Sequence, residues 1–413
     1  FMQETFLNEF QKRGYFNQCT DQSALEELMS KSKIKAYIGF DCTAPSLHVG
    51  SLMQIMCLRL LQKYGHQPIV LLGGGTTLIG DPSGKEETRK IIEKREIDKN
   101  IKSIENVFKI FLKSKNPKTK PVFVNNYSWL SKLNYINFLR QIGKHFTVNK
   151  MLTFDSVKLR LEREQSLSYM EFNYMMLQAY DFYELFKRQK CILQIGGSDQ
   201  WGNIVNGTDL IKRKDKKQAY GLTTSLITLS SGAKMGKTEK GAVWLNKKML
   251  SAYDYWQFWR NTDDKDVINF LKLFTDLNLE KIDSLKINKD INELKILLAN
   301  EATSMLHGTK AAKDSETTAQ KTFRDKSIGK DLPTIKIKKN QILNGMNIFD
   351  LVLQTKLANS KSEIRRMIKN NGLKINNEVI TDETKIINQN NFDENNSLKV
   401  SHGKKQHIIV KII

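Results

Sequence analysis

The sequence lacks the features that mark membrane proteins, zinc ribbons and disulfide-bonded scaffolds. No apolar run approaches the ~18 residues of a membrane-spanning helix, so we expect no membrane span. The 4 cysteines (Cys19, Cys42, Cys57 and Cys191) form no Cys-x-x-Cys pair, which favours reduced thiols over a zinc site or a disulfide framework. The N-terminal region has no arginine-rich amphipathic stretch, so we expect no targeting peptide and a cytoplasmic location. Only 6 prolines leave little room for long linkers.

Positive charge is in clear excess. The 413 residues include 66 lysines and arginines against 44 acidic residues, for a net charge of +22. Such a charge attracts polyanions at long range, which suggests a nucleic acid as partner. A general over-use of lysine along the chain is the alternative explanation, so the charge alone does not decide between them. The length predicts two or three domains.

Strand-like and helix-like segments alternate over the first part of the chain. Candidate strands are residues 34–40, 68–72, 122–124 and 191–195, and candidate helices are 49–64, 130–142 and 200–212. This alternation predicts an α/β fold, with a doubly wound parallel sheet of the Rossmann type as the catalytic domain over residues 1–222. Ligands of such sheets bind beyond the carboxyl ends of the strands.

The remainder of the chain has a different pattern. Helical periodicity prevails from about residue 246, so we expect residues 223–324 to form a loop followed by an α-helical domain. Gly329, Pro333 and scattered lysines then predict a linker over residues 325–340. Residues 341–413 are expected to form a small, basic α+β domain.

Two segments have the composition of phosphate-binding sites. In the first, a strand is followed by His48-Val-Gly50-Ser51 at the start of a helix, where free amides and the helix dipole favour a phosphate. The second, residues 229–238, reads Leu-Ser-Ser-Gly-Ala-Lys-Met-Gly-Lys-Thr, a small-residue loop that could place Lys234 and Lys237 on a triphosphate. Taken singly, a helix-start histidine and a solvated lysine turn are the plainer interpretations.

Together, the two segments resemble the HIGH and KMSKS signatures of the class I aminoacyl-tRNA synthetases, in the expected order and separation. The segments 72–85, 174–181 and 194–203 narrow the resemblance to the bacterial-type tyrosyl-tRNA synthetases, over essentially the whole chain. The resemblance implies ligation of tyrosine to tRNA(Tyr), through tyrosyl-adenylate, to the 3′-terminal adenosine. Ser51 departs from the signature, which usually has a second histidine there; serine still offers a shorter hydrogen-bond donor.

A pocket for tyrosine is expected on one helix. Tyr174, Gln178 and Asp181 lie at i, i+4 and i+7, hence on one face, and burying them is unfavourable unless a polar ligand satisfies them. The resemblance implies that Tyr37 and Asp181 hold the phenol hydroxyl. It also implies roles in binding the amino-acid end of the substrate for Asp81, Tyr174, Gln178 and Gln200.

Adenylation requires positioning and charge stabilisation, because the attacking carboxylate is already ionised and pyrophosphate leaves. The resemblance implies ATP as a substrate, Mg²⁺ arriving with it, no prosthetic group and no metal site of the protein. The implied ATP-binding residues are Gly39, Asp41, Thr43, His48, Gly50, Gly197, Asp199 and Lys237. The implied catalytic residues are His48, Ser51, Lys234, Lys237 and Thr238.

A basic helix and an apolar insertion complete the expectations. The segment Lys361–Lys369 reads as a helix that resembles part of a small RNA-binding module, although a solvated helix face is the alternative. The resemblance also implies a homodimer, with an interface insertion around residues 125–190, most apolar over 125–151. The expected tRNA-binding residues are Lys361, Arg365, Arg366 and Lys369.

Two other functions remain possible at this point. A tryptophanyl-type synthetase would share the fold and both signatures, although Asp181 favours a substrate with a hydroxyl group. A non-catalytic RNA-binding protein could keep the scaffold without the reaction, although His48, Lys234 and Lys237 are intact.

Overall fold

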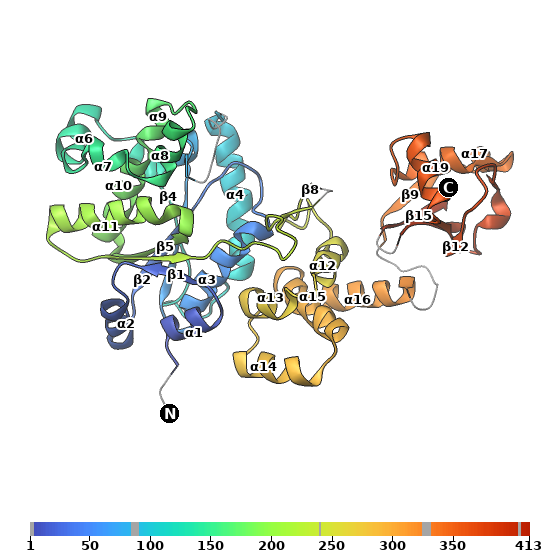
Figure 1. Ribbon diagram of the computed structural model, residues 1–413, viewed down its shortest axis with the longest axis horizontal. Helices are drawn as coiled ribbons and strands as arrows, with labels where there is room; N and C mark the ends of the chain where they lie inside the picture. Colours follow the sequence, from blue (N-terminus) through green and yellow to red (C-terminus); the bar gives the residue numbers. More distant parts are fainter. Residues whose placement is uncertain (1–3, 84–90, 239–240, 324–331, 404–405) are drawn as a thin grey trace. The chain divides into compact units, whose positions relative to one another are not determined.

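The computed structural model describes residues 4–83, 91–238, 241–323, 332–403 and 406–413 (Figure 1). The chain divides into two compact units, the first formed by residues 1–251 and 257–306 and the second by residues 252–256 and 307–413. In the described parts of the chain, no helix is long and apolar enough to cross a membrane.

A six-stranded sheet forms the centre of the first unit, with the strand order β1-β6-β5-β2-β3-β4. All neighbouring strands are parallel except β1 and β6, which pair antiparallel. The four strands expected from the sequence are present. β1 and β6 were not predicted, because β1 is only partly buried and β6, although buried, contains a glycine and two threonines. The strands are β1 (Phe16–Cys19), β2 (Lys35–Phe40), β3 (Gln67–Leu72), β4 (Val122–Asn125), β5 (Cys191–Gly197) and β6 (Tyr220–Thr224).

Helices cover both faces of this sheet, as the predicted doubly wound α/β fold requires. On one face, the ring of Tyr37 packs against Phe182 of α10 (Tyr174–Gln189), with centroids 5.4 Å apart. On the other, Phe40 packs against Phe108 of α4 (Lys94–Phe111) at 4.6 Å. Successive β2 side chains alternate between the faces. α11 (Trp201–Asp215) lies beside α10, and α3 (Leu52–Lys63) follows β2 (Figure 1).

The remaining helices of the first unit lie around the sheet and in the chain that follows it. They are α1 (Phe6–Lys12), α2 (Gln22–Lys31), α5 (Tyr127–Leu130), α6 (Tyr135–Gln141), α7 (Val148–Met151), α8 (Asp155–Glu162), α9 (Tyr169–Phe172), α13 (Val267–Phe274), α14 (Leu279–Asn288) and α15 (Ile291–His307). α12 (Ala252–Arg260) contributes residues to both units.

The helical segment that follows the sheet packs with the sheet-bearing part of the chain. Residues 257–306, assigned from the sequence to a separate helical domain, belong to the same unit as the sheet. The cause is long-range contact: Arg13 and Tyr15 donate hydrogen bonds to carbonyl groups at the end of α13, such as Tyr15 to the oxygen of Leu273 at 2.6 Å. Local sequence patterns carry no information about such contacts.

The second unit contains α16 (Thr309–Phe323) and a five-stranded sheet of order β12-β11-β14-β15-β9. β9 (Thr334–Ile337) lies within the expected linker over 325–340 and pairs parallel with β15 (Gln406–Ile412), so the linker was predicted too long. The alternating Thr-Ile-Lys-Ile of β9 buries Ile337 in the core, a pattern hidden by the nearby lysines and Pro333. The other elements are β10 (Met346–Asn347), β11 (Leu373–Ile375), β12 (Glu378–Val379), β13 (Ile386–Ile387), β14 (Ser397–His402), α17 (Lys339–Leu343), α18 (Ile348–Thr355) and α19 (Lys361–Lys369).

Candidate active site

A cavity of about 490 Å³ opens beyond the carboxyl ends of β2 and β5. These neighbouring strands mark the point where the chain turns from one half of the sheet to the other, the usual ligand site of doubly wound folds. The structure brings most of the expected site residues to its wall. The expected residues lining the cavity are Tyr37, Gly39, Asp41, Thr43, His48, Gly50, Ser51, Asp81, Tyr174, Gln178, Asp181, Gly197, Asp199 and Gln200.

The described polar side chains of the second signature loop do not line this cavity. Lys234 is exposed and, in the described part of the chain, does not line the cavity. Thr238 is also exposed, on strand β7 (Lys237–Thr238), which pairs with β8 (Gly241–Ala242). The backbone of Lys237 belongs to β7, but its side chain lies outside the described parts of the structure.

Asp181 lies at the bottom of the cavity on α10 and is buried. Its Oδ1 accepts a hydrogen bond from Trp129 Nε1 at 2.7 Å, and its Oδ2 accepts one from Asn126 Nδ2 at 2.9 Å. Burial raises the pKa of Asp181 to about 7 in spite of these bonds. The roles of Asn126 and Trp129 escaped the sequence reasoning, although their position directly after a strand could have signalled them.

Two polar atoms of the cavity are buried without a partner. Among the described residues, neither the hydroxyl of Tyr37 nor Oε1 of Gln194 has a hydrogen-bond partner. Burial, followed by the negative charge of Asp181, raises the pKa of Tyr37 well above its usual range. An unpaired buried polar group costs about 1–3 kcal/mol, so these atoms are suited to a polar ligand. Gln194 was missed as a site residue, although a glutamine within the apolar strand β5 was a signal.

A second polar group forms the side of the cavity near α11. Gln200 Nε2 donates to Asp81 Oδ2 at 2.8 Å, and Gln178 Nε2 donates to Gln200 Oε1 at 3.1 Å. Burial and the charge of Asp41 raise the pKa of Asp81 to about 6. The same kind of burial raises the pKa of Tyr174 well above its usual range. Both Asp41 and Asp81 line the cavity, and their negative charges favour a cationic ligand there.

The two signature segments meet at His48. Its Nδ1 accepts a hydrogen bond from the Gly50 amide at 2.9 Å. A Cβ atom on Gly236 would lie 2.4 Å from Nδ1 of His48, and Gly236 has a φ of +102°, so both the space and the backbone demand glycine there. The two segments, which are far apart in the sequence, are therefore in contact in the structure.

The described residues contain no group of three or more His, Cys, Asp or Glu side chains that could hold a metal ion.

The basic helix α19 presents all four expected residues to solvent. Ser360 caps it, accepting a hydrogen bond from the Glu363 amide at 3.2 Å. Arg365 forms an ion pair with Glu383 at 3.2 Å and lies over the ring of Phe349, so part of its charge is locally balanced.

Comparison with known proteins agrees with this arrangement. The family described as tRNA synthetases class I (W and Y) matches residues 29–324, and the tyrosine–tRNA ligase SYY-like C-terminal domain matches residues 325–410. The tyrosine–tRNA ligase of Pelagibacter ubique is 65% identical over 408 residues, which cover 99% of each chain. That of Rickettsia massiliae is 51% identical over 409 residues, covering 98% of this chain and 100% of the relative.

Solved structures show the same fold. A C-terminally truncated mitochondrial tyrosyl-tRNA synthetase of Aspergillus nidulans superposes with a TM-score of 0.71 at 29% identity, covering 78% of this chain and 95% of that one. The chain therefore belongs to the class I tRNA synthetases of the tryptophan and tyrosine type. Within that family it is a tyrosine–tRNA ligase, as its relatives over the whole length are, and the predicted fold, family and enzymatic function are confirmed.

Proposed function

We propose that the cavity binds L-tyrosine with its phenol group between Tyr37 and Asp181. The observation that carries this proposal is the buried, unpartnered hydroxyl of Tyr37 beside a buried carboxyl group. The substrate hydroxyl would accept from Tyr37, which gives that buried hydroxyl a partner, and would donate to Asp181 as a further hydrogen bond. Phenylalanine would leave the Tyr37 hydroxyl unpaired, at about 1–3 kcal/mol, and would offer no hydrogen bond to Asp181.

The opposite end of tyrosine fits the second polar group. The α-ammonium group would lie against Asp81, Tyr174 and Gln178. Its three N–H donors would be accepted by the carboxylate, hydroxyl and amide oxygens of these side chains. Gln200, which already bonds Asp81 and Gln178, would hold the substrate in line with the phosphate site.

ATP would occupy the mouth of the cavity. The α-phosphorus of ATP, which the tyrosine carboxylate attacks, would lie near His48 and Ser51 at the start of α3. Backbone amides and the helix dipole there stabilise the negative charge that develops during the reaction. Mg²⁺ would arrive with the phosphates and neutralise part of their charge. The nucleotide would further contact Gly39, Asp41, Thr43, Gly50, Gly197 and Asp199.

The loop residues would act on the departing pyrophosphate. Lys234, Lys237 and Thr238 supply two ammonium groups and a hydroxyl, which stabilise charge as it develops. Because Lys234 is exposed outside the cavity wall, its side chain must move inward when ATP binds.

Transfer to tRNA would use the basic face of the second unit. The residues that would contact phosphates of tRNA(Tyr) are exposed on α19 and are Lys361, Arg365, Arg366 and Lys369. We place this reaction in the cytoplasm, where tRNA is charged.

A homodimer is the proposed assembly. The insertion exposes large apolar side chains, including Tyr135, Ile136, Val148 and Tyr169, at 59–66% of their surface. Contiguous exposed apolar side chains of this kind favour association with a second copy. Analytical ultracentrifugation of an Ile136→Asp variant would show monomers if this surface forms the interface.

Pyrophosphate exchange with tyrosine, phenylalanine and tryptophan tests the pocket. The protein should respond to tyrosine, and an Asp181→Ala variant should lose activity and also narrow the preference for tyrosine over phenylalanine. If activity falls while the preference is intact, the phenol is read by other groups. Response to tryptophan, or absence of any adenylate, would refute the assignment altogether.

A further inference from the structure

Asp266, at the start of α13, binds the second signature loop instead of its own helix. Its Oδ2 accepts hydrogen bonds from the backbone amide of Ser230 at 3.1 Å and from Ser230 Oγ at 2.9 Å. An aspartate at this N-cap position usually accepts from amides of the first turn, but within the described residues Asp266 makes no such bond. The carboxylate keeps its favourable place near the positive end of the helix dipole while it holds the loop.

The part of the loop that Asp266 holds is a closed turn. The amide of Leu229 donates to the oxygen of Ala233 at 3.2 Å, and that of Gly232 donates to the oxygen of Leu229 at 2.8 Å. Thr228 and Lys234 form a β-bridge across the base of this turn. Fixing Ser230 at the tip therefore restricts Lys234 at the base, because few backbone torsions between them remain independent.

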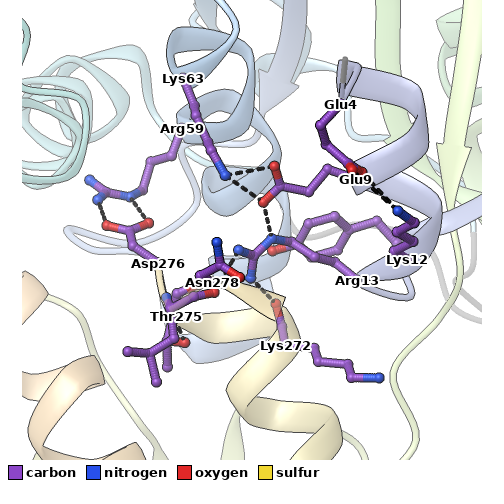
Figure 2. Close-up of polar contacts among 12 residues, drawn as sticks. Glu4, Glu9, Lys12, Arg13, Arg59, Lys63, Lys272, Thr275, Asp276 and Asn278 are labelled. Atoms are coloured by element: carbon purple, nitrogen blue, oxygen red, sulfur yellow. Dashed lines mark hydrogen bonds and ion pairs between the residues drawn. The ribbon is translucent and has the colours of Figure 1, made fainter. Parts of the chain in front are cut away.

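The other end of α13 is anchored to the sheet-bearing part of the unit (Figure 2). Arg13, which follows α1 directly, donates to the carbonyl oxygens of Lys272 at 2.8 Å, Thr275 at 3.2 Å and Leu277 at 2.8 Å. Arg13 in turn pairs with the buried Glu9 at 2.7 Å, to which Lys63 of α3 also donates at 2.6 Å.

This anchor is electrostatically stable. Burial by itself would raise the pKa of Glu9, but hydrogen bonds from Lys63, Tyr64 and Arg13 outweigh it and hold the pKa below its usual value. α3 directly follows the first signature segment. One end of α13 is therefore connected to α3 through Arg13 and Glu9, and its other end holds the second signature loop through Asp266, so that α13 acts as a strut between them.

We propose that Asp266 is a positioning residue for Lys234: by holding Ser230 on the strut α13, it keeps the turn 228–234 ordered, so that Lys234 needs only a small movement to reach the phosphates of ATP. This inference rests on the proposed role of Lys234 in adenylation. Without the anchor, the loop samples more conformations, and the fraction with Lys234 within reach falls.

Single-turnover adenylation measures this effect. Asp266→Ala should lower the rate constant roughly tenfold, the loss expected for a solvent-exposed hydrogen-bonded carboxylate, with tyrosine affinity unchanged. Asp266→Asn keeps an acceptor oxygen for Ser230 and should restore most of the rate. Asp263→Asn is the matched control, since it removes a charge three residues away without touching the loop, and it should react like the unmodified protein.

Two further measurements separate positioning from a general loss of structure. Trypsin should cleave after Lys234 faster in Asp266→Ala than in the control, while the thermal midpoints of both stay close to that of the unmodified protein. In a Lys234→Ala background, Asp266→Ala should cause little additional loss, because the two residues act in one step.

The outcomes are distinguishable. An unchanged or faster adenylation rate constant in Asp266→Ala would overturn the positioning role. The same conclusion would follow if the fold-loss of the double variant equalled the product of the two single-variant losses. If Lys234→Ala alone leaves adenylation unchanged, the proposed function of Lys234 is wrong, whatever Asp266 does.

Discussion

Asp181 should make the empty protein less stable as the pH rises, and Asp181→Asn should remove that dependence. Burial raises the pKa of Asp181 from 3.8 to about 7. Between these values, the folded protein keeps a proton that the unfolded chain has released, so the free energy of unfolding falls as the pH rises through the window. Above about pH 7 both states are ionised and the cost is constant. Asparagine has no such titration, so the stability of the variant relative to the unmodified protein should rise with pH and then level off.

The magnitude follows from the width of the window. About two pH units separate pH 5 from the pKa of Asp181, and each corresponds to about 1.4 kcal/mol, so the relative gain between pH 5 and pH 8 should be about 3 kcal/mol. A constant loss of about 1–3 kcal/mol opposes it, since the new amide would face the Asn126 Nδ2 donor. Asn126 cannot simply turn over, because its Oδ1 accepts from the Gly75 amide at 2.7 Å. The variant should therefore be the less stable protein at pH 5 and reach or pass the unmodified one by pH 8.

Urea denaturation at pH 5, 6, 7 and 8, followed by circular dichroism without tyrosine, measures this difference. Other buried groups such as Asp81 titrate in both proteins and cancel. Asp98→Asn, on α4 with an exposed ion pair to Lys94, is the control and should show no such rise. Parallel pH profiles for Asp181→Asn and the unmodified protein would refute the conclusion that burial holds this carboxyl group in an unfavourable state.

Three other perturbations test separate parts of the molecule. Arg13→Met should cost about 3–5 kcal/mol in urea denaturation, because it removes the buried ion-pair partner of Glu9 and the donor to three backbone carbonyls, whereas Lys12→Met at an exposed pair should cost under about 1 kcal/mol. Lys237→Ala should slow single-turnover adenylation with little change in tyrosine affinity; an unchanged rate constant would exclude a transition-state role. Deletion from Asp331 onward should leave tyrosine-dependent pyrophosphate exchange nearly intact but abolish most tRNA charging, and equal loss of both would mean that this part supports the catalytic fold.

Local features of the sequence predicted the parallel strands and α19 well. The limits of α19 agree with the predicted segment Lys361–Lys369, because Ser360 caps the first turn and Gly372 follows its end. β2, β3 and β5 can be recognised in the sequence as apolar runs, because helices cover both faces of the sheet and bury these strands. Such signals lie within one element, so a single sequence suffices to find them.

Contacts between distant elements could not be predicted in this way. The packing of residues 257–306 with the sheet-bearing part of the chain was not predicted, because Arg13 binds carbonyls some 260 positions further along, as its bond to Thr275 illustrates. The assignment of β9 to a linker failed for the same reason, since its partner β15 is the last strand of the chain. In both cases the information lies in pairing across the sequence rather than in local periodicity.

The residues of the proposed tyrosine pocket depart from the usual rules of packing in a consistent way. Gln194 interrupts an apolar strand, Tyr37 buries a hydroxyl, and Asp181 buries a carboxyl group, and each lowers the stability of the empty protein. Such departures from the rules of packing persist where another requirement outweighs them. A ligand that offers a hydroxyl to Tyr37 and Asp181 relieves several of these costs at once, whereas a ligand without one relieves few. On the proposed binding mode, the instability of the empty pocket would be the physical source of its selectivity for a hydroxyl-bearing substrate.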